Sequence, residues 1–521
     1  MASTTPRKKR PTRSARSVSF SLPPLKFPLA RLVHPLQSST SQWLVLPVLL
    51  MIAFLFRWAV GLGSYSGMAA PPMHGDFEAQ RHWMEITTKL PVREWYWHDL
   101  QWWGLDYPPL TAYHSWLVGL IGSKINPTWF ALHDSRGVDD PILKVFMRVS
   151  VVASEYLTYI PAIVLFVRSY GARSGLNSYE KSIAFAAILM NPSIMLIDHG
   201  HFQFNTVMFG FAFLAVDCFL TDHLLWGSFF FVCSLCFKQM ALYYAPAVFA
   251  YLLGLCFFPK FDFGRLFMLG ATVIATFMVM FAPLVVFGGP EQVKQCIIRV
   301  FPFARGLWED KVANFWCASN VAIKYKEYFD QSQLQLASLL ATLAGIMPTC
   351  LILFFYPQKR LLPLGLATCA WSFFLFSFQV HEKSVLLPLL PLTLFHAGSL
   401  DTDTTSWITW VNNIAVFSLW PLLKRDGLAL QYTVIGMFYA WLMGTFQRLP
   451  KGWFGKLVHL GSYAAVIGLH VAEQVVGKVE GLPDLWTVGN VLVCFGCYVL
   501  AWGWALQRLW NEAKSPKNKT E

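Results

Sequence analysis

The stretch HGDFEAQRHW, residues 74–83, follows shortly after an apolar run at residues 43–63 that is long enough to cross a bilayer. It places two carboxylates, two histidines and an arginine near the end of that run, in a chain of which only 13% is charged. Charged side chains next to a bilayer are costly, so a cluster of them indicates a function. Asp76, however, also follows two prolines and Gly75 and begins a helix-like segment, as a helix N-cap does. The local sequence leaves both interpretations of Asp76 open.

The composition around this stretch is that of an integral membrane protein. Of the 521 residues, 55% are hydrophobic, and the mean hydropathy is +0.45. Repeated apolar runs of about 20 residues predict an all-α polytopic bundle. The net charge of +12 comes mainly from the N-terminal region, short loops and the C-terminus, which indicates membrane topology and argues against nucleic-acid binding. Most of the 10 cysteines lie within apolar runs, where no structural zinc site is expected.

The basic residues set the expected orientation of the chain. Residues 1–42 are rich in Arg, Lys, Ser, Thr and Pro and are expected to form a disordered cytosolic tail. We expect the short segment at 110–121 to lie along the membrane interface on the far side, because the basic loops near 168–181 and 359–360 then become cytosolic. Residues 43–508 are expected to form a single transmembrane domain, followed by a second basic cytosolic tail at 509–521.

The apolar runs predict about fourteen membrane helices. Their expected bounds are 43–63, 144–168, 181–197, 203–221, 224–240, 241–258, 263–287, 333–356, 361–378, 384–398, 405–423, 427–446, 455–475 and 484–507. An even number of spans returns the C-terminus to the cytosol. The non-cytosolic face then receives two long loops, 64–143 and 288–332, and two short turns, 198–202 and 379–383.

These loops and turns hold most of the unusual polar side chains. The aromatic run at 95–103 fits an interfacial belt, and it would also suit stacking on sugar rings. Arg299 and Arg305 lie among aromatic residues on a face where the positive-inside trend disfavours cations, so a phosphate ligand is the simplest explanation. His381 and Lys383 add two basic groups at the end of a span, although pairing of the lysine with the neighbouring glutamate would also explain it.

Motifs of several other enzyme classes are missing. The sequence contains no P-loop, Rossmann glycine fingerprint, G-x-S-x-G or H-E-x-x-H motif. A D-x-D motif occurs at 401–403, but the expected topology places it on the cytosolic side. The sequence therefore argues against nucleotide-sugar and zinc-hydrolase chemistry.

In the segments at 74–87, 104–113, 299–317 and 379–384, the chain resembles the lumenal, polyprenyl-phosphate-sugar-dependent glycosyltransferases of the GT-C fold. It is most similar to the dolichyl-phosphate-glucose-dependent α1,3-glucosyltransferases of N-glycan assembly that add the first glucose. The resemblance extends over about residues 43–508. It implies a GT-C fold in the endoplasmic-reticulum membrane, with both termini in the cytosol and the active site in the lumen.

The resemblance also implies a reaction. The donor would be dolichyl-phosphate glucose, and the acceptor the dolichyl-diphosphate oligosaccharide with nine mannoses. The transfer would be inverting and metal-independent, with a first-loop aspartate as the base, which by position is Asp76. Such a reaction needs one carboxylate to take the proton of the attacking mannose hydroxyl, whereas the phosphate leaving group needs only cations. We expect no cofactor besides the donor, and a monomer that contacts the membrane lipids.

The remaining site residues follow from these roles. Four cations are expected to bind the donor phosphate, with Arg305 the first choice: Arg305, Arg299, His381 and Lys383. Two carboxylates are expected to bind the acceptor or to shape the site: Asp106 and Glu78.

Three alternatives stay open at this stage. The first is the sister enzyme that adds the second glucose, and the second is a multi-span lipid or sugar transporter whose pathway includes the polar segment at 198–201. The third is an inactive subunit of a glycosylation complex. The sequence also leaves open whether Cys296 and Cys317 form a disulfide, and whether the C-terminal lysines are a retrieval signal or a solvated tail.

Overall fold

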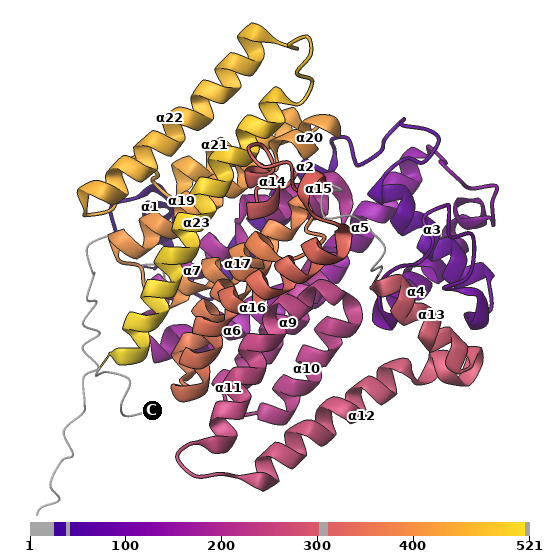
Figure 1. Cartoon of the computed structure of the whole chain (residues 1–521), viewed down its shortest axis with the longest axis horizontal. Helices are drawn as coiled ribbons and strands as arrows, with labels where there is room; N and C mark the ends of the chain where they lie inside the picture. Colours follow the sequence, from indigo (N-terminus) through magenta and orange to yellow (C-terminus); the bar gives the residue numbers. More distant parts are fainter. Residues whose placement is uncertain (1–24, 38–41, 302–310, 516–521) are drawn as a thin grey trace, which may run out of the picture.

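The computed structural model describes residues 25–37, 42–301 and 311–515. Over these ranges every regular element is a helix, and Figure 1 shows the helices gathered around a common core. Six helical segments are long and apolar enough to cross a membrane: Pro141–Arg173, Ser178–Phe202, Gln239–Phe257, Phe263–Gly288, Gln331–Phe355 and Leu485–Lys514. The prediction of a polytopic helical membrane protein is therefore confirmed, whereas the number of about fourteen spans stays a prediction.

The helices have the following bounds. The first part of the chain contains α1 (Pro28–Gln37), α2 (Val45–Gly61), α3 (Asp76–Lys89), α4 (Pro109–Ile125), α5 (Pro141–Leu157), α6 (Tyr159–Arg173), α7 (Ser178–Leu189), α8 (Pro192–Ile194), the π-helix η4 (Met195–Phe202), α9 (Asn205–Leu220), α10 (Leu224–Phe237), α11 (Ala245–Phe257), α12 (Phe263–Gly288) and α13 (Pro290–Val300). The second part contains α14 (Phe315–Ser319), α15 (Tyr325–Tyr328), α16 (Gln331–Phe355), α17 (Leu362–Phe376), α18 (Leu386–Leu394), α19 (Thr402–Ser418), α20 (Trp420–Arg425), α21 (Ala429–Leu442), α22 (Trp453–Val476) and α23 (Leu485–Lys514). Short 3-10 helices are η1 (Gln42–Leu44), η2 (Val92–Glu94), η3 (Pro127–Phe130), η5 (Gln239–Tyr244), η6 (Lys359–Leu361), η7 (Glu382–Val385) and η8 (Phe395–Ala397).

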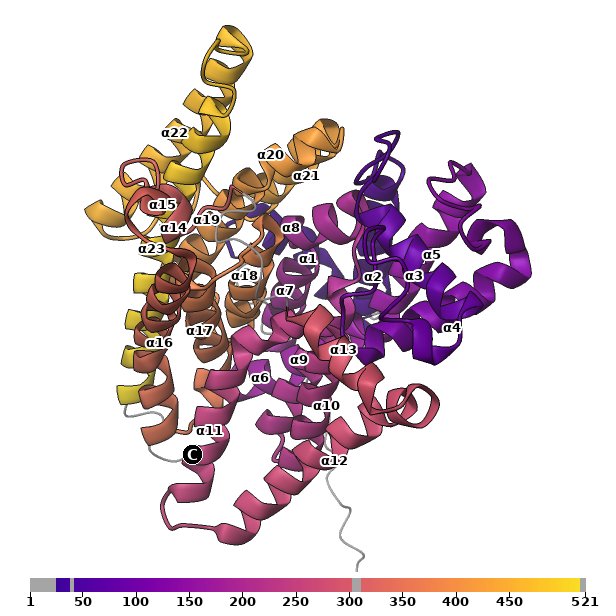
Figure 2. The same cartoon turned by 45° about the vertical axis from the view of Figure 1, so that its right-hand side comes forward.

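The centre of the bundle is built from helices that are apolar on all sides. Helix α9 packs between α6 and α10, and α17 packs between α16 and α18. The segment from α7 through η4 is entirely buried over its most apolar window. Helices α3, α4 and α13 lie on the right in Figure 1, while α23 lies on the left, and α3 and α4 are again on the side away from α23 in Figure 2. The polar first loop is thus attached at one end of an apolar core.

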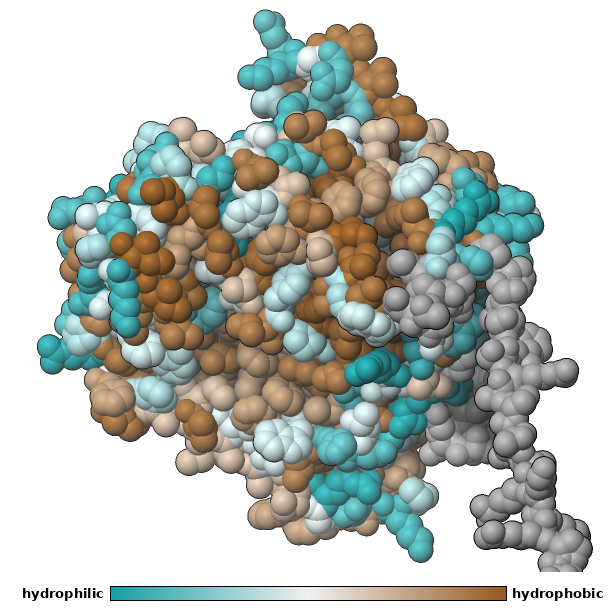
Figure 3. Space-filling model, turned by 180° about the vertical axis from the view of Figure 1, so that it is seen from behind, coloured by the Kyte–Doolittle hydropathy of each residue, from teal (hydrophilic) through white to brown (hydrophobic). Residues whose placement is uncertain are grey.

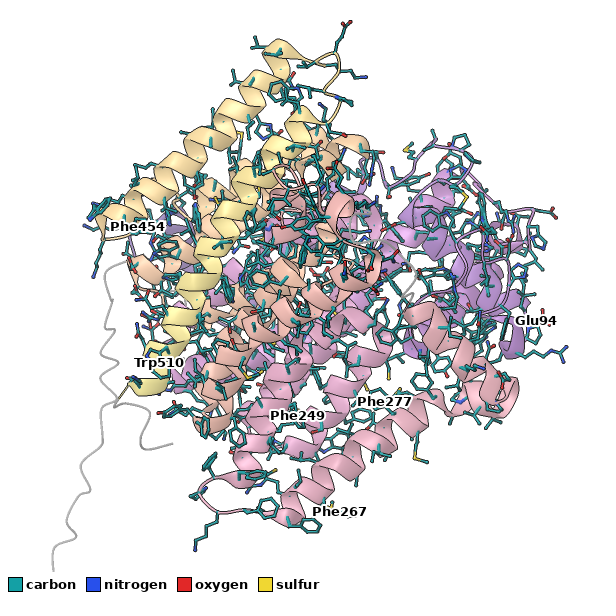
Figure 4. The ribbon with its side chains drawn as sticks, in the orientation of Figure 1. Glu94, Phe249, Phe267, Phe277, Phe454 and Trp510 are labelled. Atoms are coloured by element: carbon teal, nitrogen blue, oxygen red, sulfur yellow. The ribbon has the colours of Figure 1, made fainter. Side chains whose placement is uncertain are left out.

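The outer surface of the bundle is that of a protein in contact with lipid. Figure 3 shows apolar side chains across much of the middle of the rear face. Phe267 on α12 and Phe454 on α22 point away from the bundle in Figure 4, with 62% and 51% of their surface exposed. Glu94, which also points outward, lies instead at the end formed by α3 and α4. Exposed aromatic side chains of this size indicate burial in a bilayer.

The expected disorder of residues 1–42 is wrong for the part from Pro28 to Gln37, which forms α1. Phe27, Leu29 and Val33 are buried, and the Tyr179 hydroxyl donates to the Ala30 carbonyl over 2.7 Å. These apolar side chains recur at helical spacing and pack on α7 and α21, although the basic residues around them suggested a solvated tail. Residues 1–24 lie outside the described residues.

The differences from the predicted spans and turns include the following. The run 144–168 contains two helices, α5 and α6, which are separated at Thr158, and the run 405–423 divides at Leu419 into α19 and α20. The expected turn at 198–202 is instead part of η4, in which every residue is buried. The polar side chains of this π-helix are tolerated because other helices supply partners, such as Glu155 for His199 at 2.7 Å.

Candidate active site

Asp76 is the first residue of α3, and the N-cap position belongs to Gly75, so the interpretation of Asp76 as the N-cap is wrong. Ser66 fixes the backbone here: its hydroxyl accepts from the Asp76 N–H over 3.1 Å, and its own N–H donates to the His201 carbonyl over 3.0 Å. A Cβ at Gly75 would lie 2.5 Å from the Ser66 hydroxyl. Only glycine allows this close approach, which ties the start of α3 to the end of η4.

Three side chains from distant segments converge on one oxygen of Asp76. His201 Nε2 lies 2.9 Å from Asp76 Oδ2, and Gln203 and Lys383 both donate to the same oxygen. The carboxylate keeps 20% of its side-chain surface exposed. Asp76 is therefore held by side-chain contacts rather than by capping geometry, and it retains an open face.

The surrounding charges keep Asp76 ionised. Burial by itself would raise the pKa of this carboxyl group, but the cation of Lys383 and the hydrogen-bonded ring of His201 outweigh burial and hold the pKa well below its usual range. At neutral pH, Asp76 is thus a carboxylate with the lone pairs that a base requires.

His201 has a second carboxylate partner. Its Nδ1 atom lies 2.5 Å from Oδ2 of Asp426, and the two side chains are 1% and 3% exposed. Asp426 directly follows α20, so it comes from a part of the chain far from Asp76. The sequence singled out the segment 198–201 only for the transporter alternative and did not single out Asp426. The sequence feature that could have identified these residues is the presence of several ionisable side chains within otherwise apolar stretches.

A buried lysine extends the network on the other side. Lys238 donates to Gln203 Oε1 over 2.7 Å and to Asn205 Oδ1 over 2.8 Å, and its Nζ lies 4.7 Å from the centroid of the Tyr107 ring. Lys238 is 1% exposed and was also missed from the sequence. Its position could have identified it, because a single lysine between two apolar runs needs partners inside the protein.

Asp76 opens onto a cavity of about 660 Å³. The cavity is lined by side chains from α3, the loop at 100–107, α13, α16 and the segment 377–384, including Trp83, Trp103, Asp106, Arg299, His381 and Lys383. The lining also includes Leu339 on α16, which is 55% exposed. A polar pocket with aromatic walls thus continues to the apolar surface of the bundle, and its volume suits a sugar phosphate with part of a lipid chain.

Most of the residues predicted for the site line this cavity. Arg299 donates to the carbonyls of Gly104 and Leu105, at 3.0 and 3.3 Å, and so joins α13 to the first loop. Asp106 and His381 line the same cavity. Lys383 lies on Asp76 itself, whereas the sequence predicted it for the donor phosphate. Arg305 lies outside the described residues.

Glu78 is separated from the cavity. Both of its oxygens accept from Arg81, at 2.6 and 2.8 Å, and the residue is only 4% exposed. Arg81 also pairs with Glu85 at 2.7 Å, and Glu85 contacts His82 Nδ1 at 3.1 Å. This ion cluster is on the inner side of α3, so Glu78 fits the role of shaping the site rather than that of binding the acceptor.

The aromatic run at 95–103 is divided between several environments. Trp95 is buried, Trp97 is 51% exposed, and Trp103 lines the cavity while its Nε1 donates to the Met73 carbonyl over 2.5 Å. The exposed Trp97 therefore suits anchoring at the membrane interface, whereas Trp103 is placed to contact a ligand in the cavity. Cys296 and Cys317 do not form a disulfide with each other.

The sequence was compared with known proteins. It matches the ALG6, ALG8 glycosyltransferase family over residues 53–504. It is 46% identical over 524 residues to the dolichyl pyrophosphate Man9GlcNAc2 alpha-1,3-glucosyltransferase of Saccharomyces cerevisiae, with 94% of this chain and 96% of the relative covered. It is 46% identical over 483 residues to a probable enzyme of the same name from Schizosaccharomyces pombe (92% and 95% covered) and 45% identical over 403 residues to the Gallus gallus enzyme (75% and 77% covered).

Proposed function

Because this chain belongs to the ALG6, ALG8 glycosyltransferase family, we propose that it adds the first glucose to the dolichyl-diphosphate oligosaccharide with nine mannoses, through an α1,3 linkage. The names of its relatives, which specify Man9GlcNAc2, support this acceptor over one that already carries a glucose. The proposed donor is dolichyl-phosphate glucose. The proposed location is the endoplasmic-reticulum membrane, with the site in the lumen and both termini in the cytosol.

The observation that carries this proposal is the ionised Asp76 at a cavity with cationic walls. In the proposed reaction Asp76 takes the proton of the attacking mannose hydroxyl, and the mannose oxygen forms a bond to C1 of glucose. The bond from C1 to the phosphate oxygen breaks, and its electron pair leaves with the phosphate. Because attack and departure occur on opposite sides of C1, the configuration inverts.

The cations of the cavity are suited to the leaving phosphate. Arg299 and His381 line the same cavity as Asp76, and Lys383, which contacts the carboxylate, is proposed to share its charge with a bound phosphate. Arg305 is proposed for the same role on its sequence alone. Asp106 is proposed to contact the acceptor sugar.

The shape of the cavity supports a lipid-linked donor. Its lining contains Asp76 and also Leu339 and Thr342 of α16, a helix with many exposed apolar side chains. A polyprenyl chain can therefore remain among lipids while its phosphate and glucose enter the cavity. We propose that the transfer needs neither a metal ion nor a further cofactor, and that a monomer performs it. Activity that persists in EDTA is the expected result.

Glucose transfer by purified Asp76→Asn protein tests the proposal. The substitution keeps the size of the side chain but removes the base, so kcat should fall by about 10²- to 10⁴-fold. Asp134→Asn, in an exposed part of the same loop, is the matched control and should keep the wild-type rate. A folded Asp76→Asn protein with the wild-type rate would show that Asp76 is not the base. Wild-type protein that glucosylates only an acceptor already carrying one glucose would identify it as the sister enzyme.

A further inference from the structure

Lys238 is a buried cation one side chain away from Asp76, and the proposed reaction has not yet used it. We propose that Lys238 is a positioning residue: through Gln203 it holds Oδ2 of Asp76, so that Oδ1 is the oxygen that takes the proton from the acceptor hydroxyl. This inference rests on the proposed function, since it names the atom of Asp76 that acts in glucose transfer. Lys238 directly follows α10 and is 1% exposed.

The lysine determines which way the Gln203 amide faces. An ammonium group only donates, so the contact of 2.7 Å from Lys238 Nζ requires the amide oxygen of Gln203 on that side. The amide nitrogen is then directed at Asp76 and donates to its Oδ2 atom. With the two ends of the amide exchanged, its oxygen would face the carboxylate and repel it. The cation therefore gives the glutamine a direction that the glutamine does not have by itself.

A second amide beside Lys238 has the same arrangement. Asn205 Oδ1 accepts from Lys238 Nζ over 2.8 Å, while Asn205 Nδ2 donates to Oδ1 of Asp198 over 2.8 Å. The Tyr107 ring, whose centroid lies 4.7 Å from Nζ, provides a third partner for the ammonium group. Lys238 thus turns the oxygen of each amide toward itself and the nitrogen of each toward a carboxylate. Because the lysine is buried, water cannot take its place between the two amides.

The two oxygens of Asp76 are left in different environments. His201, Gln203 and Lys383 all contact Oδ2, and no residue in the described ranges donates a hydrogen bond to Oδ1. Lys383 brings a charge to the carboxylate, whereas Gln203 is neutral and orients it without neutralising it. Hydrogen bonds make Oδ2 less basic, so Oδ1 is the oxygen available to a hydroxyl group in the cavity that Asp76 lines.

Kinetics of Lys238→Met with both purified substrates test this assignment. Methionine keeps much of the length of the side chain but cannot donate, so Gln203 loses its direction and kcat should fall by about 10- to 100-fold. KM for either substrate should stay unchanged, because Lys238 does not line the cavity of about 660 Å³. A folded Lys238→Met protein with wild-type kcat would overturn the inference.

Arg448→Met is the matched control, because it also removes a buried cation. Arg448 is 7% exposed and contacts the Leu400 carbonyl and the Phe27 ring, neither of which lines the cavity. Loss of this cation should lower Tm but leave kcat of the folded protein at the wild-type value. A loss of kcat in Lys238→Met that Arg448→Met does not share therefore reports positioning rather than stability.

The pH profile of Gln203→Glu tests the amide while Lys238 stays in place. Glutamate keeps an oxygen toward the lysine, but it replaces the donor that faces Asp76 with a second carboxylate oxygen. The pKa of Asp76 should therefore rise, and the acid limb of kcat should move to higher pH. His201 and Lys383, the other groups in contact with the Asp76 carboxylate, are unchanged in this variant. An acid limb at the wild-type pH would overturn the inference, including where Lys238→Met does not fold.

A double-mutant cycle tests whether Lys238 acts through Gln203. If it does, Lys238→Met should cost little further kcat in a protein that already carries Gln203→Leu. An equal loss in both backgrounds would overturn the inference. Failure of the proposed function is distinguishable, because the wild-type protein would then transfer no glucose, or Asp76→Asn would keep the wild-type rate.

Discussion

Lys383 donates from Nζ to Oδ2 of Asp76, which joins two residues that are 307 positions apart. A cation suited to the proposed donor phosphate therefore neutralises the proposed base. We expect a bound donor phosphate to compete for the same lysine, so that Asp76 would lose a counter-charge and become a stronger base. Donor binding and activation of the proposed base would then be linked through one side chain.

Replacement of Lys383 by methionine should separate these two effects. Without the cation, the pKa of Asp76 should rise toward its ordinary value, so the acid limb of kcat should move to higher pH. KM for the donor should increase roughly 10- to 100-fold through loss of a charge-assisted hydrogen bond. Steady-state kinetics at several pH values would measure both. Lys294→Met, at an exposed position of α13, is the control, and unchanged KM and pH dependence in Lys383→Met would rule out the link.

A Gly75→Ala substitution should impair catalysis through the backbone. The added Cβ would lie 2.5 Å from the Ser66 hydroxyl and 2.7 Å from the backbone nitrogen of Gly67, so the start of α3 must shift. A displacement of about 1 Å at Asp76 should lower kcat by roughly 10²-fold. Gly461→Ala has open space around it within α22 and should keep the wild-type rate and Tm. Normal kcat in Gly75→Ala would mean that the close approach does not position Asp76.

Glu85 should make the stability of the first loop depend on pH. Burial raises the pKa of Glu85, but His82, Arg81 and a backbone N–H outweigh it and lower the pKa from 4.5 to about 2. Because the folded-state pKa is depressed, this stabilisation is present above pH 4.5 and is lost as the pH falls toward 2. Glu85→Gln should destabilise the protein at neutral pH by about 3 kcal/mol. It should also reduce the dependence of Tm on pH between pH 4.5 and 2.

Thermal unfolding in detergent between pH 2 and 7 measures this effect. Glu94→Gln is the control, because the Glu94 side chain is 44% exposed and an exposed ion pair contributes little. Parallel Tm curves for Glu85→Gln and the wild type would contradict the assignment to Glu85.

The proposed topology makes a prediction about glycosylation. Acceptor sequons inserted after Leu100 and after Asp134, both at exposed positions, should both be modified if α4 lies along the membrane and both positions face the lumen. A sequon after Lys260, between α11 and α12, should stay unmodified. Mobility shifts reversed by a glycosidase would record the outcome. Modification at only one of the first two positions would show that α4 crosses the membrane.

Helices with long uniform apolar runs could be predicted closely from the sequence. The run 263–287 corresponds to α12, and 333–356 corresponds to α16. The break at Thr158 could not be predicted, because hydropathy stays high on both sides of it and only packing between α5 and α6 reveals it. Helix α1 was missed for the opposite reason. Basic residues surround its short apolar face, and that face is recognised only when the helices that it packs against are known.

The candidate site was predicted in part because topology alone groups residues by membrane face. Asp76, Arg299, His381 and Lys383 were assigned to one face, and the structure brings them to one cavity. The role of Asp426 could not be predicted, because an aspartate after two basic residues also fits a solvated turn. Only the distance to His201 identifies it as a partner.

The position of Asp426 also has a consequence for the order of synthesis. The ribosome makes the base Asp76 early, but the residues that complete its surroundings, Lys383 and Asp426, emerge only after most of the 521-residue chain. The N-terminal helices can insert and begin to pack before then. A nascent or prematurely truncated chain that ends before residue 426 would therefore present the proposed base without its buried partners, and catalytic competence would begin only near the end of translation.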